Sequence, residues 1–127
     1  MGDRFKEFTE FRHKMNERIL AQDNKVIKRF FSIDTLTYQE GALNVKTKEL
    51  LGLVASLVLR CDDCIAYHIN KCKEAGVARD EMFEAMSVGL VVGGSIVIPH
   101  LRRAVAFLDE IETMETNGSS QELSEKN

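Results

Sequence analysis

The chain has 127 residues, of which 44% are hydrophobic and 29% charged, and it contains one proline, no tryptophan and three cysteines. This composition excludes a disordered chain, which would be poorer in apolar residues, and a collagen-like chain, which would be far richer in glycine and proline. Because three cysteines cannot all pair within one chain, a secreted disulfide scaffold is not expected either. The length is typical of one domain that buries a core without a metal or disulfide staple.

The net charge of −3 lies in the C-terminal tail. Residues 112–127 hold four Glu and one Lys, so the rest of the chain carries sixteen basic and sixteen acidic side chains. A balanced body offers no basic face, and we therefore expect no nucleic-acid partner. The longest run of apolar, glycine and serine residues, 88–99, is shorter than the about 20 residues that cross a bilayer. The N-terminus is charged throughout, unlike a signal peptide, so we expect a cytoplasmic protein with no membrane partner and with reduced thiols.

The N-terminal quarter, residues 1–31, is predicted to form a helical arm. Apolar side chains in its first helix recur at spacings of three and four: Phe5, Phe8, Phe11, Met15 and Ile19. Apolar pairs in residues 26–31 predict a second, short helix. We interpret the phenylalanine stripe as core or as subunit-docking surface rather than as a ligand pocket. Residues 32–44 are predicted to be a connector that has room for one helical turn and that Gly41 interrupts.

The next helix, predicted over residues 45–60, has almost no polar face. Asn44 is its predicted N-cap, since an Asn side-chain oxygen can accept a first-turn N–H. Over residues 49–59 the helix consists of leucine, valine and alanine, with Glu49, Gly52 and Ser56 as the exceptions. A helix that is apolar all round must be buried on all sides. We therefore expect another subunit to cover part of this helix.

Two further helices follow, at residues 62–75 and 80–92. Gly76 is well placed as the left-handed residue that ends the first of them. The second has no Ser or Thr at its N-cap position, and acidic residues in its first turn are expected to compensate the helix dipole instead.

A last helix is predicted over residues 95–114, where Pro99 is tolerated only in the first turn. No segment alternates convincingly at period two, so the predicted fold class is all-α, with a core domain over residues 32–115. Residues 116–127 are polar and contain glycine and serine, and they are predicted to be a disordered acidic tail.

One cluster carries chemistry: Cys61, Cys64 and His68, at the start of the helix predicted over residues 62–75. A helix turns about 100° per residue, so residues three and four apart share one face. The Cα atoms of the two cysteines are then close enough for a disulfide. The first-turn N–H groups of a helix stabilise a thiolate, the reactive form of cysteine, and His68 can take or return a proton near neutral pH.

Four interpretations of this cluster compete. The cysteines could be small buried hydrophobic residues, or they could form a structural disulfide, which a reducing cytosol disfavours. A zinc site with all three cysteines is excluded, because Cys61 and Cys72 lie about 16 Å apart along one helix. A three-ligand metal site of Cys61, Cys64 and His68 stays open. We favour a redox-active dithiol with an attached proton relay, which requires no metal and no cofactor, and we interpret Cys72 as a packing residue.

Glu49 is the only acidic residue of the apolar helix and the candidate partner of His68. If the chain reverses after this helix, the two helices pack antiparallel and Glu49 lies about one turn from the level of His68. A buried carboxylate without a partner is costly. Lys46, Lys48 or solvent could satisfy it. Otherwise Glu49 orients His68, and His68 handles the proton of Cys64.

These residues resemble a known family, the alkylhydroperoxidase AhpD-like core of the carboxymuconolactone decarboxylase superfamily. The resemblance lies in three motifs: KTKELL from residue 46, CxxCxxxH from residue 61, and the Ala-Gly pair at residues 75–76. It covers about residues 36–111, and the Glu-to-Cys and Cys-to-His spacings together are its specific part. The resemblance implies an all-helical domain that assembles as homo-oligomers, trimers or hexamers. The chain departs from the best-known members in length, because it carries a single core copy with a helical N-terminal arm.

The resemblance also implies roles for the cluster. Cys64 would be the peroxidatic thiol that becomes a sulfenic acid, and Cys61 the resolving thiol. His68 and Glu49 would form the proton relay. The implied substrate is an organic hydroperoxide, and the implied reductant is an external dithiol of the lipoyl or thioredoxin-like kind.

The sequence departs from the best-known members of this family between the two cysteines. Asp62 and Asp63 stand there, and carboxylates beside the thiols oppose thiolate formation. We therefore expect a more strongly reducing dithiol and a slower peroxidase.

His100 is a possible accessory residue. It could reach the same pocket as a substrate-binding or second proton-handling group, or it could satisfy the backbone near a helix start. The main hypothesis is a thiol-dependent oxidoreductase that reduces a hydroperoxide or a disulfide. The alternatives are a redox sensor or non-enzymatic oligomeric binding protein, and a carboxymuconolactone-type decarboxylase. A decarboxylase needs a basic anion pocket, for which only Arg102 and Arg103 come into question.

Overall fold

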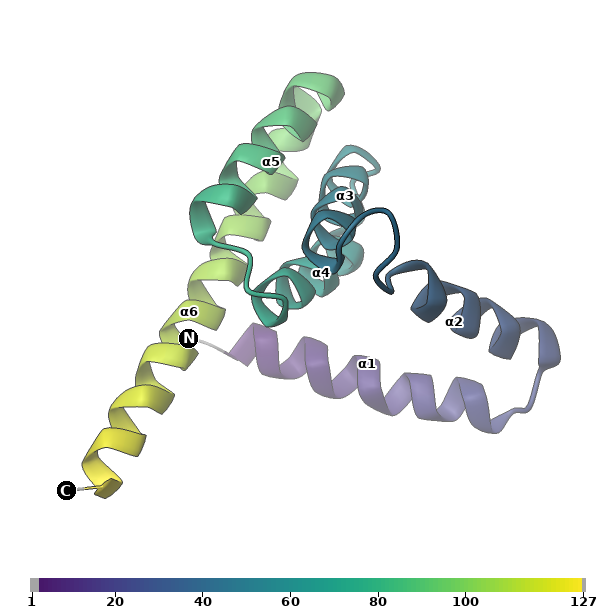
Figure 1. Cartoon of the computed structure of the whole chain (residues 1–127), viewed down its shortest axis with the longest axis horizontal. Helices are drawn as coiled ribbons and strands as arrows, with labels where there is room; N and C mark the ends of the chain where they lie inside the picture. Colours follow the sequence, from purple (N-terminus) through teal and green to yellow (C-terminus); the bar gives the residue numbers. More distant parts are fainter. Residues whose placement is uncertain (1–2, 127) are drawn as a thin grey trace.

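The computed structural model describes residues 3–126, with the side chains of residues 4–117. This part of the chain forms six α-helices and one short 3-10 turn and contains no strand. The arrangement of the helices is shown in Figure 1. The elements in chain order are α1 (Asp3–Ala21), α2 (Lys25–Thr37), α3 (Val45–Val58), α4 (Asp62–Glu74), α5 (Arg79–Gly93), η1 (Ser95–Val97) and α6 (Ile98–Lys126). The predicted all-α fold class is confirmed.

The core lies among α3, α4, α5 and α6. Helix α3 packs against both α4 and α5, and α6 runs along α4 (Figure 1). The fully buried side chains include Leu53, Leu57, Met82 and Phe107, one or more from each of α3, α5 and α6. Burial of such large apolar side chains provides most of the free energy that holds the four helices together.

Local sequence signals explain where the core helices begin and end. Asn44 caps α3, because its Oδ1 accepts the N–H of Thr47 at 2.8 Å. Gly76 follows α4 in the left-handed conformation, with φ of 82°. Pro99 falls in the first turn of α6, as predicted. At the start of α5, the side chain of Glu81 accepts the N–H of Ala78 at 2.8 Å, which satisfies one first-turn donor.

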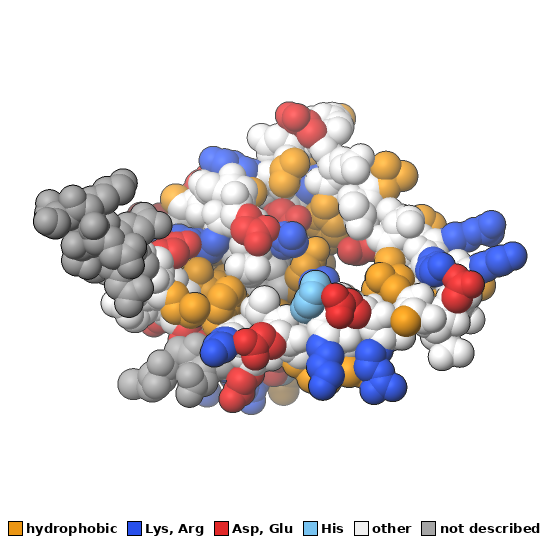
Figure 2. Space-filling model, turned by 90° about the horizontal axis from the view of Figure 1, so that it is seen from below, with side chains coloured by type: hydrophobic (Ala, Val, Ile, Leu, Met, Phe, Trp, Pro, Cys, Tyr) orange, Lys and Arg blue, Asp and Glu red, His pale blue; other side chains and the backbone are white. Residues whose placement is uncertain are grey.

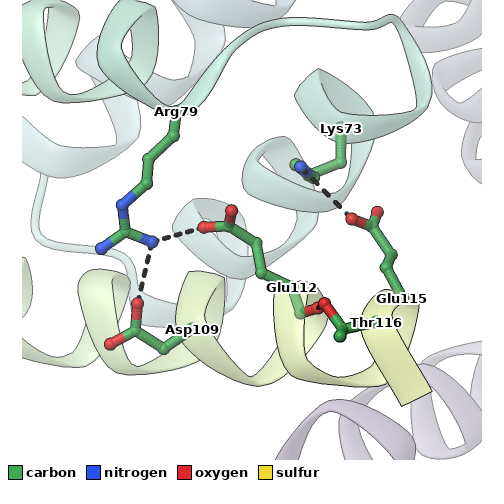
Figure 3. A network of polar contacts seen from close by, with 6 residues as sticks. All are labelled: Lys73, Arg79, Asp109, Glu112, Glu115 and Thr116. Atoms are coloured by element: carbon green, nitrogen blue, oxygen red, sulfur yellow. Dashed lines mark hydrogen bonds and ion pairs between the residues drawn. The ribbon is translucent and has the colours of Figure 1, made fainter. Parts of the chain in front are cut away.

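Polar contacts fix the outer side of α6 to its neighbours. Arg79, at the start of α5, donates to Asp109 at 2.8 Å and to Glu112 on α6. Lys73 of α4 lies 3.4 Å from Glu115, one turn further along α6. Figure 3 shows these side chains converging from α4 and α5 onto one face of α6. Because most of these groups are largely exposed, each pair contributes little to stability, and their main effect is to fix the register of the helices.

Helices α1 and α2 form an arm that projects from the core (Figure 1). The base of α1 is packed, because the rings of Phe5 and Phe8 lie 5.5 and 5.8 Å from the ring of Phe107. Phe11, further along α1, is exposed. No residue of α2 is buried. The phenylalanine stripe therefore divides: its first two members belong to the core and its third does not.

Three predicted boundaries need correction. Helix α2 extends to Thr37, so the connector starts at Tyr38 rather than at residue 32. The hydroxyls of Thr35 and Thr37 bond to carbonyls one turn back, and the apolar spacing continues through Leu36, which together favour a longer helix. Helix α3 ends two residues earlier than expected, at Val58, because the backbone of Arg60 is left-handed, with φ of 61°.

The C-terminal tail is the third difference. Helix α6 continues through Lys126, where a disordered tail over residues 116–127 is expected, and residue 127 lies outside the described part. The hydroxyl of Thr116 bonds to the carbonyl of Glu112, within the continuing helix. Composition argues for disorder, whereas the Gln, Glu, Leu and Lys residues near the end are good helix formers.

Candidate active site

Cys61 and Cys64 form a disulfide at the N-terminus of α4, with their Cα atoms 5.3 Å apart. Cys61 is the N-cap of this helix, and its Sγ accepts the N–H of Cys64 at 3.2 Å. The left-handed turn at Arg60 brings the chain from α3 into α4 directly before it. First-turn N–H groups of a helix lower the free energy of a thiolate, so the fold places both sulfurs where the reduced form is activated.

His68 and Glu49 meet across α3 and α4. The Nδ1–H of His68 donates to Oε1 of Glu49 at 2.9 Å, and both side chains are buried. The contact that the antiparallel arrangement predicts is therefore confirmed. The suggested alternative partner, Lys48, points elsewhere: its Nζ donates to the carbonyls of Thr37 and Gln39 at 2.9 and 2.6 Å. Glu49 is thus committed to His68.

Gly52 makes room for the imidazole ring, and the sequence analysis gave it no role. A Cβ atom at Gly52 would lie 2.6 Å from Cε1 of His68 and 2.8 Å from each ring nitrogen. These distances are far below van der Waals contact, so the ring packs directly on the backbone of α3. Gly52 lies one turn after Glu49 on the same helix, and this spacing is the signal in the sequence that could have identified it.

Tyr38 is the second residue that sequence reasoning missed. Its hydroxyl lies 3.3 Å from Nε2 of His68, and the two ring centroids are 5.3 Å apart. Burial, followed by the nearby charge of Glu49, raises the pKa of Tyr38, so the phenol stays protonated. No local pattern identifies it, because its partner is 30 residues further along the chain and on another element.

Cys64 and His68 both line a cavity of about 1020 Å³ between the arm and α4. Five of the thirteen other lining residues are aromatic and come from α1, α2 and α4: Phe8, Phe11, Phe30, Phe31 and Tyr67. Phe8 and Phe11 therefore line a pocket, which corrects the interpretation of the phenylalanine stripe as core or docking surface rather than a ligand pocket. The guanidinium of Arg12 lies over the Tyr67 ring, 4.1 Å from its centroid. Figure 2 shows hydrophobic and charged side chains around a hollow on the face seen there. Cys64 of the disulfide and His68 therefore face the same space.

Cys72 lies apart from this space. Its side chain is fully buried in the core, and burial raises the pKa of its thiol to about 12. A thiol with such a pKa is almost entirely protonated at neutral pH and is a poor nucleophile. Its burial agrees with its interpretation as a packing residue.

His100 lies on the other side of α4, and it is not among the residues that line the cavity. Its Nδ1 is 2.8 Å from Oδ1 of Asp62, and Arg103 donates to the second oxygen of the same carboxylate at 3.3 Å. The structure therefore does not place His100 in the pocket with Cys64, because Asp62 holds it against the core side of α4. Asp63, in contrast, is one of the residues that line the cavity. The two acidic residues face opposite ways.

Two further observations concern ligands and membranes. The described part of the chain contains no group of three or more His, Cys, Asp or Glu side chains arranged to hold a metal ion. Within residues 3–126, no helix combines the length and apolar character needed to cross a bilayer.

Known proteins resemble this chain over most of its length. The model of the carboxymuconolactone decarboxylase family matches residues 25–107. The protein TM1620 of Thermotoga maritima is 57% identical, and the match covers 88% of this chain and 98% of that chain with a TM-score of 0.85. A second crystal structure of TM1620, 56% identical with a TM-score of 0.84, covers 88% of this chain and 95% of that one. In that second structure, TM1620 is described as a carboxymuconolactone decarboxylase family protein that is a candidate for a role in the antioxidative response.

Two more distant proteins extend the comparison. The protein lpg0406 of Legionella pneumophila, of the same family, is 22% identical and has a TM-score of 0.79. The match covers 85% of this chain and 96% of that one, and the likeness concerns the fold alone. Uncharacterized protein 4 in the cox locus of Paracoccus denitrificans is 28% identical over 83 residues, which are 65% of this chain and 75% of that protein.

Proposed function

The chain belongs to the carboxymuconolactone decarboxylase family, and we propose that it is a cytoplasmic thiol-dependent peroxidase of the AhpD-like kind. One observation carries the proposal: Cys64, which forms the disulfide with Cys61, and His68, which is bonded to Glu49, line the same cavity. A dithiol that can close a disulfide and a buried base beside it are the two parts that thiol peroxidase chemistry needs.

The reaction proceeds in three steps. His68 takes the proton of Cys64, and the thiolate attacks one oxygen of the hydroperoxide, so that the O–O bond breaks and Cys64 becomes a sulfenic acid. The alkoxide that leaves takes the proton back from His68 and departs as an alcohol. The thiol of Cys61 then attacks the sulfenic sulfur, which forms the disulfide and releases water. An external dithiol reduces the disulfide and is itself oxidised.

The cavity supports an organic rather than an inorganic hydroperoxide as the substrate. Its aromatic walls offer apolar surface beside Cys64, and its volume accommodates a substrate much larger than hydrogen peroxide. Its charged residues are of both signs: Arg4, Arg12, Glu7, Asp34 and Asp63. The description of TM1620 as a candidate for an antioxidative response agrees with this assignment.

The same cavity gives less support to a decarboxylase that acts on an anionic lactone acid. Such an enzyme needs a basic pocket, and acidic side chains outnumber basic ones in this lining. Arg103 is bound to Asp62 outside the cavity, and Arg102 does not line it.

We also propose that the chain works as a homo-oligomer, a trimer or a hexamer. One side of α2 presents a stripe of exposed apolar residues: Val26, Phe30, Ile33 and Leu36. A second exposed apolar patch lies on α5 and η1: Val88, Val91, Val92 and Ile96. Exposed patches of this kind are typical of subunit interfaces, and contact between two different patches closes into a ring. Phe30→Asp is expected to lower the mass measured by light scattering, while Arg29→Glu on the same helix leaves it unchanged.

The proposal is tested by turnover. The full chain, a hydroperoxide and excess dithiol are mixed, and the consumption of the hydroperoxide is followed. Cys64→Ser and His68→Ala are expected to lose activity, whereas Cys72→Ser, which changes the buried thiol, retains it. Full activity in Cys64→Ser would show the mechanism to be wrong. A redox sensor differs from the proposed enzyme in one readout: it is oxidised once and shows no sustained turnover when the reductant is present.

A further inference from the structure

The two nitrogens of His68 have different partners, and these partners assign the tautomer of the ring. Glu49 is a carboxylate that only accepts, so the proton of the neutral ring lies on Nδ1. Nε2 then carries the lone pair, and the only hydrogen bond to it in the described structure comes from the hydroxyl of Tyr38. Cys64 is held in the disulfide in this structure, so its proton is present only after reduction. The nitrogen that must take the thiol proton is therefore already occupied.

The position of Tyr38 is fixed from both sides. The ammonium group of Lys48 binds the carbonyls of Thr37 and Gln39, which are the residues immediately before and after Tyr38. Lys48 precedes Glu49 on α3, so the helix that supplies the carboxylate also holds the tyrosine in place. The distance of 3.3 Å between the hydroxyl and Nε2 is thus set by an anchored segment rather than by a free loop.

We propose that Tyr38 is a positioning residue that restrains the proton relay by holding Nε2 of His68. The proposal deepens the proposed function, on which it rests. A hydrogen bond from the phenol to the lone pair stabilises the neutral ring, because the lone pair is lost when the ring is protonated. Cys64 must displace Tyr38 before it can transfer its proton. Removal of the hydroxyl frees the base, so the thiolate of Cys64 forms more readily.

The other charged and titratable groups around the ring do not bond to its nitrogens. They come from α1, α2 and α4 and are Arg12, Asp34, Asp63, Tyr67 and Lys71. Among these groups, Tyr67 resembles Tyr38 most, because it is also a phenol in contact with the His68 ring. Its ring also packs edge-to-face against His68, with centroids 5.1 Å apart, but its hydroxyl makes no hydrogen bond to His68. Tyr67 therefore provides a matched control: a second phenol beside the same ring.

The experiment measures the alkylation of Cys64 by iodoacetamide in the reduced full chain that carries Cys61→Ser. Cys72 is buried, so Cys64 is the reactive thiol, and the rate between about pH 5 and pH 9 reports the fraction of thiolate. In Tyr38→Phe we expect alkylation below neutral pH to be about two- to tenfold faster, the effect of one hydrogen bond. The two curves should converge at high pH, where the thiol is ionised without help. Tyr67→Phe should follow the parent curve.

Three outcomes overturn the proposal. These are a Tyr38→Phe curve that coincides with that of the parent, one that is slower, and an equal acceleration in Tyr67→Phe, which would indicate looser packing of the ring. If Tyr38→Phe does not fold, Lys48→Met serves as the second variant. It releases the carbonyls on both sides of Tyr38 and should shift the curve in the same direction, while an unshifted curve there also overturns the proposal.

A further variant separates this proposal from the proposed function. His68→Gln removes the base itself, and it should slow the alkylation of Cys64 below neutral pH. If His68→Gln has no effect, the relay is absent and the proposed function fails. If His68→Gln slows alkylation but Tyr38→Phe changes nothing, the relay stands and only the restraint by Tyr38 is wrong.

Discussion

The core and the arm are built from similar helices but are stabilised in different ways. Helix α3 buries Leu53 and Leu57 completely and is in contact with two other helices, whereas α2 buries no residue at all. Both helices are rich in apolar side chains. The difference shows that apolar content alone does not bury a helix; a second surface must be available in the same chain or in another one.

The candidate site lies on the border between these two regions. The core supplies Glu49, His68 and the disulfide, which are held by packed helices. The arm and its connector supply Tyr38 and the aromatic wall opposite. Rigid elements thus hold the groups that exchange protons and electrons, and less tightly packed elements shape the space for the substrate.

The difference in stabilisation between the core and the arm can be tested most directly by replacing one phenylalanine in each. Phe107→Ala removes a ring that is buried among α1, α4 and α6, and we expect it to lower the free energy of unfolding by about 3–5 kcal/mol. Phe30→Ala on α2 changes an exposed ring and should cost less than about 0.5 kcal/mol in dilute protein. Denaturation in urea measures both. Equal losses would contradict the division into core and arm, and a loss for Phe30→Ala that grows with protein concentration would reveal a subunit interface.

Gly52→Ala tests how tightly the core side holds His68. The new methyl group would lie within 2.8 Å of three ring atoms, so the ring must move away from Glu49. A displacement of about 1 Å can cost about 100-fold in rate, and we expect a loss of this size in the turnover of hydroperoxide. Overpacking around the buried ring should also lower the free energy of unfolding by about 1–3 kcal/mol, which the higher helix propensity of alanine offsets only in part. Gly41→Ala in the connector is the control, since the new Cβ atom would lie 3.7 Å from its nearest neighbour, which is ordinary van der Waals contact. If Gly52→Ala were as active as the parent, the close packing of His68 on α3 would be contradicted.

Sequence patterns predicted the core more fully than the arm. The caps at Asn44 and Gly76 and the position of Pro99 were all readable, because each depends on residues within a few positions of one another. The end of α2 was not, since Gly41 and the polar residues after Phe31 are typical of a connector. Nothing in the local pattern shows that the threonines bond back to the helix instead.

The same distinction applies to the site. Glu49 and His68 could be paired from spacing and from the cost of a buried carboxylate. The role of Gly52 can be predicted only if the distance between α3 and α4 is known, and that of Tyr38 only if it is known where the connector crosses the core. The sequence left His100 either near the pocket or in local contacts at a helix start, and the structure places it against Asp62, away from the cavity. Contacts set by tertiary packing are the part that one sequence does not specify.

The buried thiol of Cys72 is expected to lower the free energy of unfolding as the pH rises into the alkaline range. Burial raises the pKa of this thiol from 9.0 to about 12, so the unfolded chain releases its proton at a lower pH than the folded chain. The stabilisation is complete below pH 9.0 and is lost as the pH rises toward 12, by about 1.4 kcal/mol per pH unit from this group. In Cys72→Ala, the free energy of unfolding should fall less steeply over that range. Identical slopes in parent and variant would show that the thiol titrates normally.

The smallest expected effect comes from two neighbouring residues, one facing the core and one facing the arm. Asp62 is held by His100 and Arg103, so its charge is compensated and directed away from the sulfurs. Asp63 lines the cavity with Cys64 and opposes the thiolate of the reduced state. Asp63→Asn should therefore stabilise the reduced form and raise the midpoint potential of the Cys61–Cys64 couple by about 10–20 mV, which corresponds to about 0.5–1 kcal/mol.

Asp62→Asn should change this potential less, because the carboxylate of Asp62 is paired with Arg103 and does not line the cavity with Cys64. Both midpoints can be measured against a glutathione buffer at one pH. The two substitutions are thus expected to shift the midpoint potential by different amounts, whereas the sequence alone suggested that Asp62 and Asp63 have the same effect. A larger shift for Asp62→Asn than for Asp63→Asn would mean that the N-cap sulfur of Cys61, rather than the cavity-facing sulfur of Cys64, carries the charge of the reduced state.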